Sequence, residues 1–104
     1  MEKRVWTGKI LPGKLEEYIR THQQIWPEMT EALNTQGIHN YTIWNNNDTV
    51  IGYYECESLQ YADKVKQESE ICKRWAEMMG GIMVLDAEPE TNEIKSYQQI
   101  FGHK

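Results

Sequence analysis

The order in which strand-like and helix-like patterns follow one another leaves this chain few folds to adopt. Stretches that alternate apolar and polar residues, typical of strands, are interleaved with stretches whose apolar residues recur every three or four positions, typical of helices. The order is strand, helix, strand, strand, helix, strand. It predicts an α+β, ferredoxin-like βαββαβ fold, with an antiparallel sheet and two helices on one face. The predicted strands span residues 3–11, 39–45, 50–57 and 94–101.

Turn and cap residues mark the ends of the two predicted helices. Gly13 is placed to cap the first helix, Pro27 to kink it and Gly37 to end it. Ser58 is placed to cap the second helix, which ends at Gly80. Apolar or small residues at helical spacing form two stripes that we expect to be buried: Leu15, Ile19, Trp26, Met29 and Leu33, and Ala62, Val65, Ser69, Cys72, Ala76 and Met79.

The length of 104 residues fits one domain, residues 1–104. With both helices on one face, the other face of the sheet needs cover, and a second copy of the chain would supply it. We therefore expect a homodimer, in which two such units form an α+β barrel-type assembly. The acidic segment 82–94 is interpreted as a connection, with a lid as the alternative. The residues expected on the covered face are Trp6, Trp44, Tyr53 and Phe101.

The charge balance argues against several classes of partner. The formal net charge is −5, from 11 basic and 16 acidic residues, with no basic stripe to neutralise nucleic-acid phosphates. The longest apolar run, residues 82–85, is far shorter than the about 20 residues of a membrane span. The first residues lack the apolar core of a signal peptide. We expect a cytoplasmic protein that binds neither nucleic acid nor membrane.

The spacing of cysteines and histidines gives no sign of a metal centre. Cys56 and Cys72 form no CxxC motif and are expected to be buried, reduced thiols. The three histidines, His22, His39 and His103, lack the spacing of metal ligands. No metal is therefore expected.

One of these histidines, His22, stands inside the apolar stripe of the first predicted helix. Tyr18 precedes it by one turn, at a spacing that lets the two side chains meet. His22 is either a core histidine held by one hydrogen bond or the working group of a pocket. Tyr41 on the next strand and Trp75 at the edge of the second stripe could line the same cavity. Such a cavity suits a sugar, because tryptophan stacks on a pyranose ring while tyrosine and histidine bond to its hydroxyls.

Three separated segments closely resemble the L-rhamnose mutarotase family: "EEYIRTHQQIWPEM" (16–29), "GIHNYTIW" (37–44) and "CKRWAEMM" (72–79). The similarity runs nearly end to end, with the same order of elements. The resemblance implies a ferredoxin-like homodimer that interconverts the α and β anomers of L-rhamnose. Such an enzyme is an isomerase of carbohydrate metabolism that needs no cofactor.

The resemblance also implies roles for individual residues. His22 matches the family's proton donor, and Tyr18 and Tyr41 match tyrosines that bind the sugar. Trp75 matches the first tryptophan of a tandem pair whose second member is Ala76 in this chain. The expected substrate is therefore L-rhamnose or a related 6-deoxyhexose such as L-fucose.

Mutarotation itself explains why a histidine is useful. Opening the hemiacetal delivers a proton to the ring oxygen while another leaves the anomeric hydroxyl, and the free aldehyde then rotates and recloses. Histidine titrates near neutrality and can both give and retrieve that proton. The opposing base stays open among a tyrosine hydroxyl, His39 and a bound water.

Two alternatives share this fold and pocket. One is a ferredoxin-like small-molecule monooxygenase, which uses an apolar pocket with a histidine. The other is a non-catalytic, dimeric sugar-binding module. Fold alone does not separate these from a mutarotase. The three segments favour the mutarotase, and only turnover separates it from a module that binds sugar.

Overall fold

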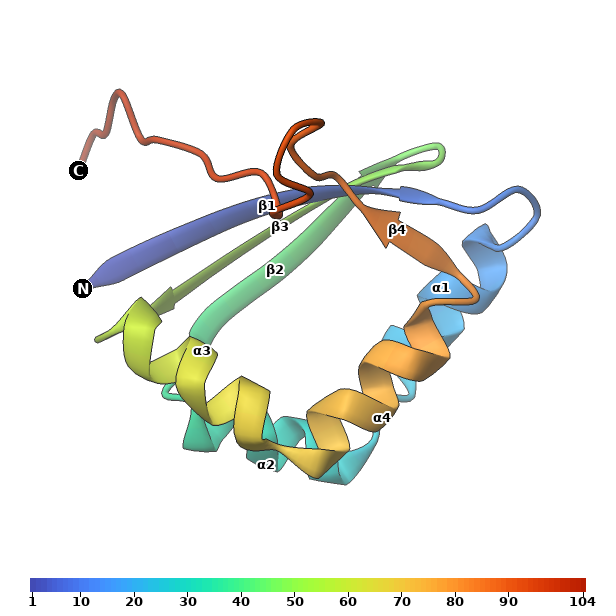
Figure 1. Cartoon of the computed structure of the whole chain (residues 1–104), viewed down its shortest axis with the longest axis horizontal. Coiled ribbons are helices and arrows are strands. Elements are labelled where there is room, and N and C mark those ends of the chain that lie inside the picture. Colours follow the sequence, from blue (N-terminus) through green and yellow to red (C-terminus); the bar gives the residue numbers. More distant parts are fainter.

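The computed structural model describes residues 1–104 as four strands and four helices (Figure 1). They are, in chain order, β1 (Glu2–Ile10), α1 (Leu15–Gln23), α2 (Pro27–Thr35), β2 (His39–Asn46), β3 (Thr49–Cys56), α3 (Leu59–Glu68), α4 (Glu70–Met79) and β4 (Met83–Leu85). The strands form one antiparallel sheet in the order β2-β3-β1-β4, and the helices lie on one side of it. The predicted α+β, ferredoxin-like fold is confirmed. None of the helices is long and apolar enough to cross a membrane.

The middle of the sheet is built from the predicted hairpin and the first strand. β2 and β3 are joined by a two-residue turn, Asn47 and Asp48, within the predicted turn segment. Asn47 has a φ of 53°, a left-handed conformation that asparagine tolerates better than most residues. β3 also pairs with nearly all of β1, so that β1 lies between β3 and β4.

The prediction that residues 94–101 form the last strand is wrong. The fourth strand is β4, whose three residues pair with Gly8, Lys9 and Ile10 of β1. Because β4 comes directly after α4, it reaches the free edge of β1 before the later residues do. The only β-type pairing of residues 94–101 is one isolated bridge, between Ala87 and Ile94.

The segment that follows β4 runs over the sheet face opposite the helices (Figure 1). Two side chains fasten it to Thr7 of β1. The Thr7 hydroxyl donates to the Asp86 carboxylate at 2.7 Å and contacts the Tyr97 hydroxyl at 2.5 Å. Thr7 alternates with the helix-facing residues Trp6 and Gly8 and points away from the helices. The part of the acidic segment beyond β4 is therefore not a lid over the helix side of the sheet.

Each predicted long helix is two shorter helices with a break between them. The first break falls at Pro27, where the preceding Trp26 is extended (φ −61°, ψ 134°), as the residue before a proline prefers. The second falls at Ser69, which we expected inside the buried stripe. Ser69 is extended (φ −86°, ψ 121°), and its hydroxyl accepts the backbone N–H of Cys72 at 3.2 Å. Ser69 ends α3 and caps α4 instead of continuing one helix.

The remaining caps agree with the sequence in all but one case. The Ser58 hydroxyl accepts the backbone N–H of Tyr61 at 3.1 Å and caps α3, as predicted. Gly37 has a φ of 76° and ends the α2 region, also as predicted. Gly13 is not the cap of α1. It lies in the preceding turn with a φ of 76°, and Lys14 holds the cap position.

The two faces of the sheet differ in what covers them. Trp6, predicted on the face away from the helices, is on the helix side, where it packs against two of the buried clusters. It shares that side with Gly8 and Ile10, since alternate residues of a strand face the same way. Trp44 does lie on the sheet face opposite the helices, the open face, and is 69% exposed. Phe101 belongs to no strand and is also exposed.

Tyr53 also lies on the open face, since its cross-strand partners there are Val5 and Thr42.

The core on the other face divides into three groups of buried side chains: Ile10, Tyr18, Val50, Met79 and Ile82; Met29, Ala32 and Cys72; and Tyr54, Cys56 and Ala62. Both cysteines are free and buried, as predicted.

Candidate functional site

Tyr18 and His22 stack on one another on α1. Their ring centroids lie 4.5 Å apart with 21° between the ring planes, which follows from their spacing of four residues. Tyr18 is 5% exposed, whereas His22 is half-buried. The histidine is therefore packed on one side and accessible on another, as a group that exchanges protons with a ligand must be.

The contacts of His22 determine which ring nitrogen is available for chemistry. Nδ1 lies 3.0 Å from the carbonyl oxygen of Tyr18 and 3.1 Å from the hydroxyl of Thr21. The carbonyl can only accept, so Nδ1 carries a hydrogen and donates it there. The Thr21 hydroxyl also donates to this carbonyl, at 2.8 Å. Nε2 has no hydrogen-bond partner in the protein and is the ring nitrogen left for a ligand.

Trp75 and Trp26 meet next to the histidine. Trp75 of α4 contacts the His22 ring edge-on, with centroids 5.5 Å apart and an interplanar angle of 82°. Trp26 contacts Trp75 in the same manner, at 5.1 Å and 89°. The break at Pro27 holds the Trp26 backbone extended and explains why the residue leaves the helical stripe to meet Trp75. Trp26 is not among the residues predicted for the site.

Tyr41 of β2 joins this group through a third tryptophan, Trp6, whose predicted position on the opposite face of the sheet was wrong. The indole nitrogen of Trp6 donates to the Tyr41 hydroxyl at 3.0 Å. The Trp6 side chain also packs against the cluster that contains Tyr18. Burial raises the pKa of Tyr41 above its usual range, and the neighbouring Tyr18 adds to the effect. The Tyr41 hydroxyl is therefore protonated at neutral pH and can donate a hydrogen bond.

The hydroxyl of Tyr18 is the one buried side-chain polar atom without a hydrogen-bond partner in the protein. An unpaired buried hydroxyl costs about 1–3 kcal/mol, so such a group usually has a partner that the protein itself does not supply. Tyr18 is therefore a core residue with one unsatisfied polar atom.

Burial of the Tyr18 hydroxyl is expected to make the fold sensitive to alkali. Burial raises the pKa of Tyr18 to about 12 from its ordinary value of 10.0. As the pH rises, the Tyr18 hydroxyl therefore loses its proton in the unfolded chain before it does in the folded one. The contribution of Tyr18 to the free energy of unfolding is complete below pH 10 and declines as the pH rises toward 12. In urea melts the free energy of unfolding should fall less steeply over this range in Tyr18→Phe than in wild type. The exposed Tyr61→Phe is the control, and equal slopes in all three proteins would contradict the assignment.

Ala76 and His39 lie outside this group of contacts. Ala76 is exposed beside Trp75, so its expected place in the buried stripe of α4 is wrong. His39 is exposed on β2, and its Nε2 lies 2.9 Å from the sulfur of Met1. The chain contains no group of three His, Cys, Asp or Glu side chains that could hold a metal ion. The Tyr18, His22, Trp26 and Trp75 cluster, with Tyr41 linked through Trp6, is the candidate active site.

Comparison with known proteins decides the family. The model of the family described as L-rhamnose mutarotase matches residues 3–103. The chain belongs to the L-rhamnose mutarotase family. The L-rhamnose mutarotase of Listeria monocytogenes serovar 1/2a is 42% identical over 85 residues, which cover 80% of this chain and 81% of the relative. That of Lachnoclostridium phytofermentans is 33% identical over 104 residues and 97% of both chains.

Solved structures agree with this fold. The crystal structure of an L-rhamnose mutarotase from Formosa agariphila matches over the whole of both chains with a TM-score of 0.78 and 20% identity. Tetracenomycin F2 cyclase from Streptomyces glaucescens matches with a TM-score of 0.73 and 12% identity, over 100% of this chain and 98% of that one. At such identities the two structures support the fold alone.

Membership of the mutarotase family confirms the resemblance noted in the sequence. It also confirms the expected class of activity, isomerisation of a sugar at its anomeric carbon. It favours the mutarotase over the monooxygenase, which shares only the fold and a pocket with a histidine.

Proposed function

We propose that this mutarotase interconverts the α and β anomers of L-rhamnose, or of a closely related 6-deoxyhexose, with His22 as the proton-transferring residue. The observation that carries the proposal is the stack of Tyr18 on His22 with Trp75 against its edge, in a chain of this family. The stack holds an imidazole at the border between core and solvent. Nδ1 is fixed by the helix backbone and Nε2 is left to face a ligand.

Protons are the only groups that pass between the enzyme and the sugar in the proposed reaction. His22 in its charged form gives the Nε2 proton to the ring oxygen of the sugar, while the anomeric hydroxyl loses its proton to a base. The bond between the anomeric carbon and the ring oxygen breaks, and an aldehyde forms. After rotation about the neighbouring carbon–carbon bond, the ring oxygen attacks the other face of the aldehyde and returns its proton to Nε2, while the aldehyde oxygen takes back the proton held by the base. Nothing is oxidised or reduced, and the reaction needs no cofactor.

The remaining site residues are proposed to hold the sugar. The unpaired Tyr18 hydroxyl and the Tyr41 hydroxyl, both protonated at neutral pH, supply hydrogen bonds to sugar oxygens. The half-buried Trp75 offers an apolar surface for the C–H face of the ring. Ala76 is exposed next to Trp75, outside the contacts of the cluster, and its small side chain would leave the adjoining flank of the sugar uncovered.

Exchange between the two anomeric protons of L-rhamnose, followed by saturation-transfer NMR, tests the proposed function. L-Fucose and D-glucose serve as comparison sugars. We expect the protein to accelerate exchange of L-rhamnose well above the buffer rate, and to accelerate D-glucose less. Binding of L-rhamnose without faster exchange would instead support the non-catalytic module. No acceleration with any sugar would overturn the proposal.

We also propose that two chains pair through the open face of the sheet to form a homodimer with a barrel-like assembly. The face carries exposed apolar side chains from three strands, Trp44, Ile51 and Val84. Exposed apolar patches of this kind mark association surfaces. A symmetric pair would bury the same patch from both chains.

A charge placed on this face is expected to separate the chains. Trp44→Glu should lower the molecular mass measured by analytical ultracentrifugation to that of one chain, because an unpaired carboxylate would be buried at the centre of the interface. Tyr61→Glu introduces the same charge at an exposed position of α3, on the helix side, and should leave the dimer intact. A Trp44→Glu protein that stays dimeric would place the interface elsewhere.

We propose a cytoplasmic location for the enzyme. Cys56 and Cys72 are both buried as free thiols. Free thiols are typical of reducing compartments, where disulfides are rare. Cell fractionation followed by immunodetection tests the location, and recovery from a secreted or membrane fraction would contradict it.

A further inference from the structure

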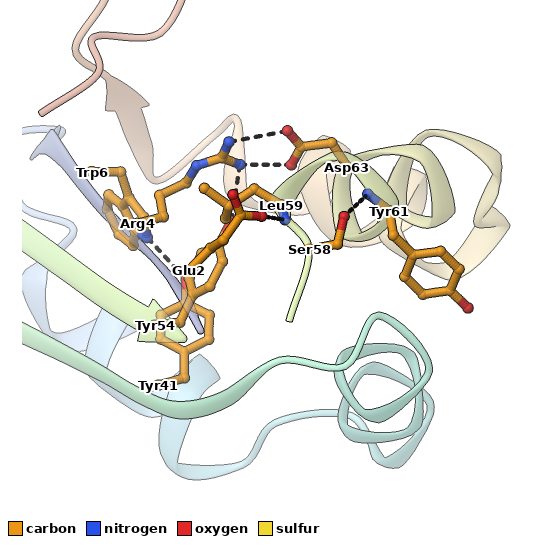
Figure 2. Close-up of polar contacts among 9 residues, drawn as sticks. All are labelled: Glu2, Arg4, Trp6, Tyr41, Tyr54, Ser58, Leu59, Tyr61 and Asp63. Carbon is orange, nitrogen blue, oxygen red and sulfur yellow. Dashed lines mark hydrogen bonds and ion pairs between the residues drawn. The ribbon is translucent and has the colours of Figure 1, made fainter. Parts of the chain in front are cut away.

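We propose that Trp6 is a positioning residue that fixes the hydroxyl of Tyr41 so that it donates its hydrogen to the sugar. This inference rests on the proposed function, because it specifies how one sugar-binding group is oriented. Trp6 comes from β1, and the two residues lie 35 positions apart in the sequence. Figure 2 shows the indole of Trp6 next to the Tyr41 hydroxyl.

The direction of the hydrogen bond between Trp6 and Tyr41 follows from chemistry. An indole N–H can only donate, so at 3.0 Å the Tyr41 oxygen is the acceptor. A tyrosine hydroxyl that accepts one hydrogen bond still has its own hydrogen to donate. No other group of the protein bonds to this hydroxyl, so its hydrogen is available to a ligand oxygen. Without Trp6, the same hydroxyl could accept from the sugar as readily as donate to it.

The position of Trp6 is set by a glycine on the neighbouring strand. Trp6 is the cross-strand partner of Gly52, and a Cβ atom at Gly52 would lie 2.1–2.4 Å from three atoms of the indole. The indole therefore occupies the space next to the Gly52 backbone that a Cβ atom of any other residue type would fill. It packs against both the buried cluster that contains Tyr18 and the buried cluster that contains Tyr54.

The ring of Tyr41 is held from its other side by Tyr54. The ring centroids of Tyr41 and Tyr54 lie 5.0 Å apart, with an interplanar angle of 50°. Arg4 donates to the Tyr54 hydroxyl at 3.0 Å and binds Asp63 of α3 with two hydrogen bonds of 2.6 and 3.0 Å (Figure 2). With its ring fixed by Tyr54 and its oxygen held by Trp6, Tyr41 keeps one orientation.

Trp6→Phe tests the inference, because it removes the donor and keeps an aromatic ring. Loss of one neutral hydrogen bond of this kind should raise KM for L-rhamnose by about 2- to 12-fold, with kcat within about twofold, since the bond holds the sugar before and during reaction. In Tyr41→Phe, which lacks the hydroxyl, adding Trp6→Phe should raise KM no further. Trp44→Phe is the matched control on the opposite face and should leave KM unchanged.

The outcomes separate this inference from the proposed function. If the wild type is active and Trp6→Phe has an unchanged KM, the inference alone is overturned. The same holds if Trp6→Phe raises KM equally in the wild type and in Tyr41→Phe. A wild type without exchange activity overturns the proposed function. The Kd of L-rhamnose, from NMR titration of the same five proteins, then replaces KM, and absence of binding overturns both.

A measurement with Trp6 intact covers the case in which Trp6→Phe does not fold. In ¹H–¹⁵N spectra, one of the four tryptophan indole signals should move upfield in Tyr41→Phe, since the Trp6 N–H loses its acceptor. Tyr53→Phe, on the open face, is the control and should leave that signal in place. An indole spectrum unchanged by Tyr41→Phe would overturn the inference.

Discussion

Replacing His22 by alanine is expected to slow enzyme-catalysed anomer exchange by about 10²- to 10⁴-fold, the usual contribution of a positioned acid–base group. The fixed Nδ1–H leaves Nε2 to carry the proton, and no other imidazole contacts the cluster. Saturation-transfer NMR of L-rhamnose measures the rate. Circular dichroism checks that the fold remains, as expected for a half-buried side chain at the end of α1.

His39→Ala is the matched control for this experiment. His39 is exposed and contacts Met1 rather than any residue of the cluster, so exchange should continue at the wild-type rate. If His39→Ala were as slow as His22→Ala, His39 would be the opposing base. Full activity in His22→Ala would move proton transfer to a tyrosine or a water and leave His22 as a packing residue.

Gly52→Ala is expected to cause the largest loss of stability among single-methyl changes in this chain. The added methyl would lie 2.1 Å from the nearest atom of the Trp6 indole, far inside contact distance. Overpacking of this kind costs about 1–3 kcal/mol, which corresponds to a fall in Tm of roughly 4–20 °C for a domain of this size. Thermal melts followed by circular dichroism measure the effect. Displacement of the indole should also raise KM, as in Trp6→Phe.

Gly81→Ala provides the control for added volume alone. A Cβ at Gly81 would meet only the carbonyl oxygen of Met78, at an ordinary 3.8 Å. Its Tm should stay within a few degrees of wild type. Equal melting temperatures for Gly52→Ala and wild type would mean that Trp6 can leave its place at little cost, which would also weaken its proposed positioning role.

Much of the fold could be predicted because local signals and global topology agree. The hairpin of β2 and β3 has two alternating stretches around a turn of asparagines, and its position was predicted closely. The prediction of the last strand was wrong because β4 has only three residues, too few for an alternation to be seen. Residues 94–101 have a stronger strand pattern, but by then the edge of β1 is occupied.

The break at Ser69 shows another limit of sequence patterns. Serine at this position is in phase with the apolar stripe, so the pattern continues through it. A serine is also a good cap, and the two possibilities differ only once α4 packs against α2, where Cys72 joins Met29 and Ala32 in one cluster. Tertiary packing decides between them, and the sequence alone does not contain that information.

The candidate site was predicted only in part for similar reasons. Tyr18 and His22 are neighbours on one helix, so their contact follows from the helical repeat. The place of Trp26 depends on how the break at Pro27 redirects the chain, which no repeat describes. The side of the sheet that Trp6 faces could have been found, because it alternates in phase with Ile10, a residue of the buried core.

The central position of β1 means that this strand is synthesised before both of the strands with which it pairs. Its partners are β3, complete at Cys56, and β4, complete at Leu85. On a ribosome that adds roughly 5–20 residues per second, β1 waits several seconds with both edges unpaired. Folding must therefore proceed by contacts between distant parts of the chain, which are slow to form and leave an unpaired strand open to association. The basic side chains of Lys3, Arg4 and Lys9 give the waiting strand a positive charge that opposes such association.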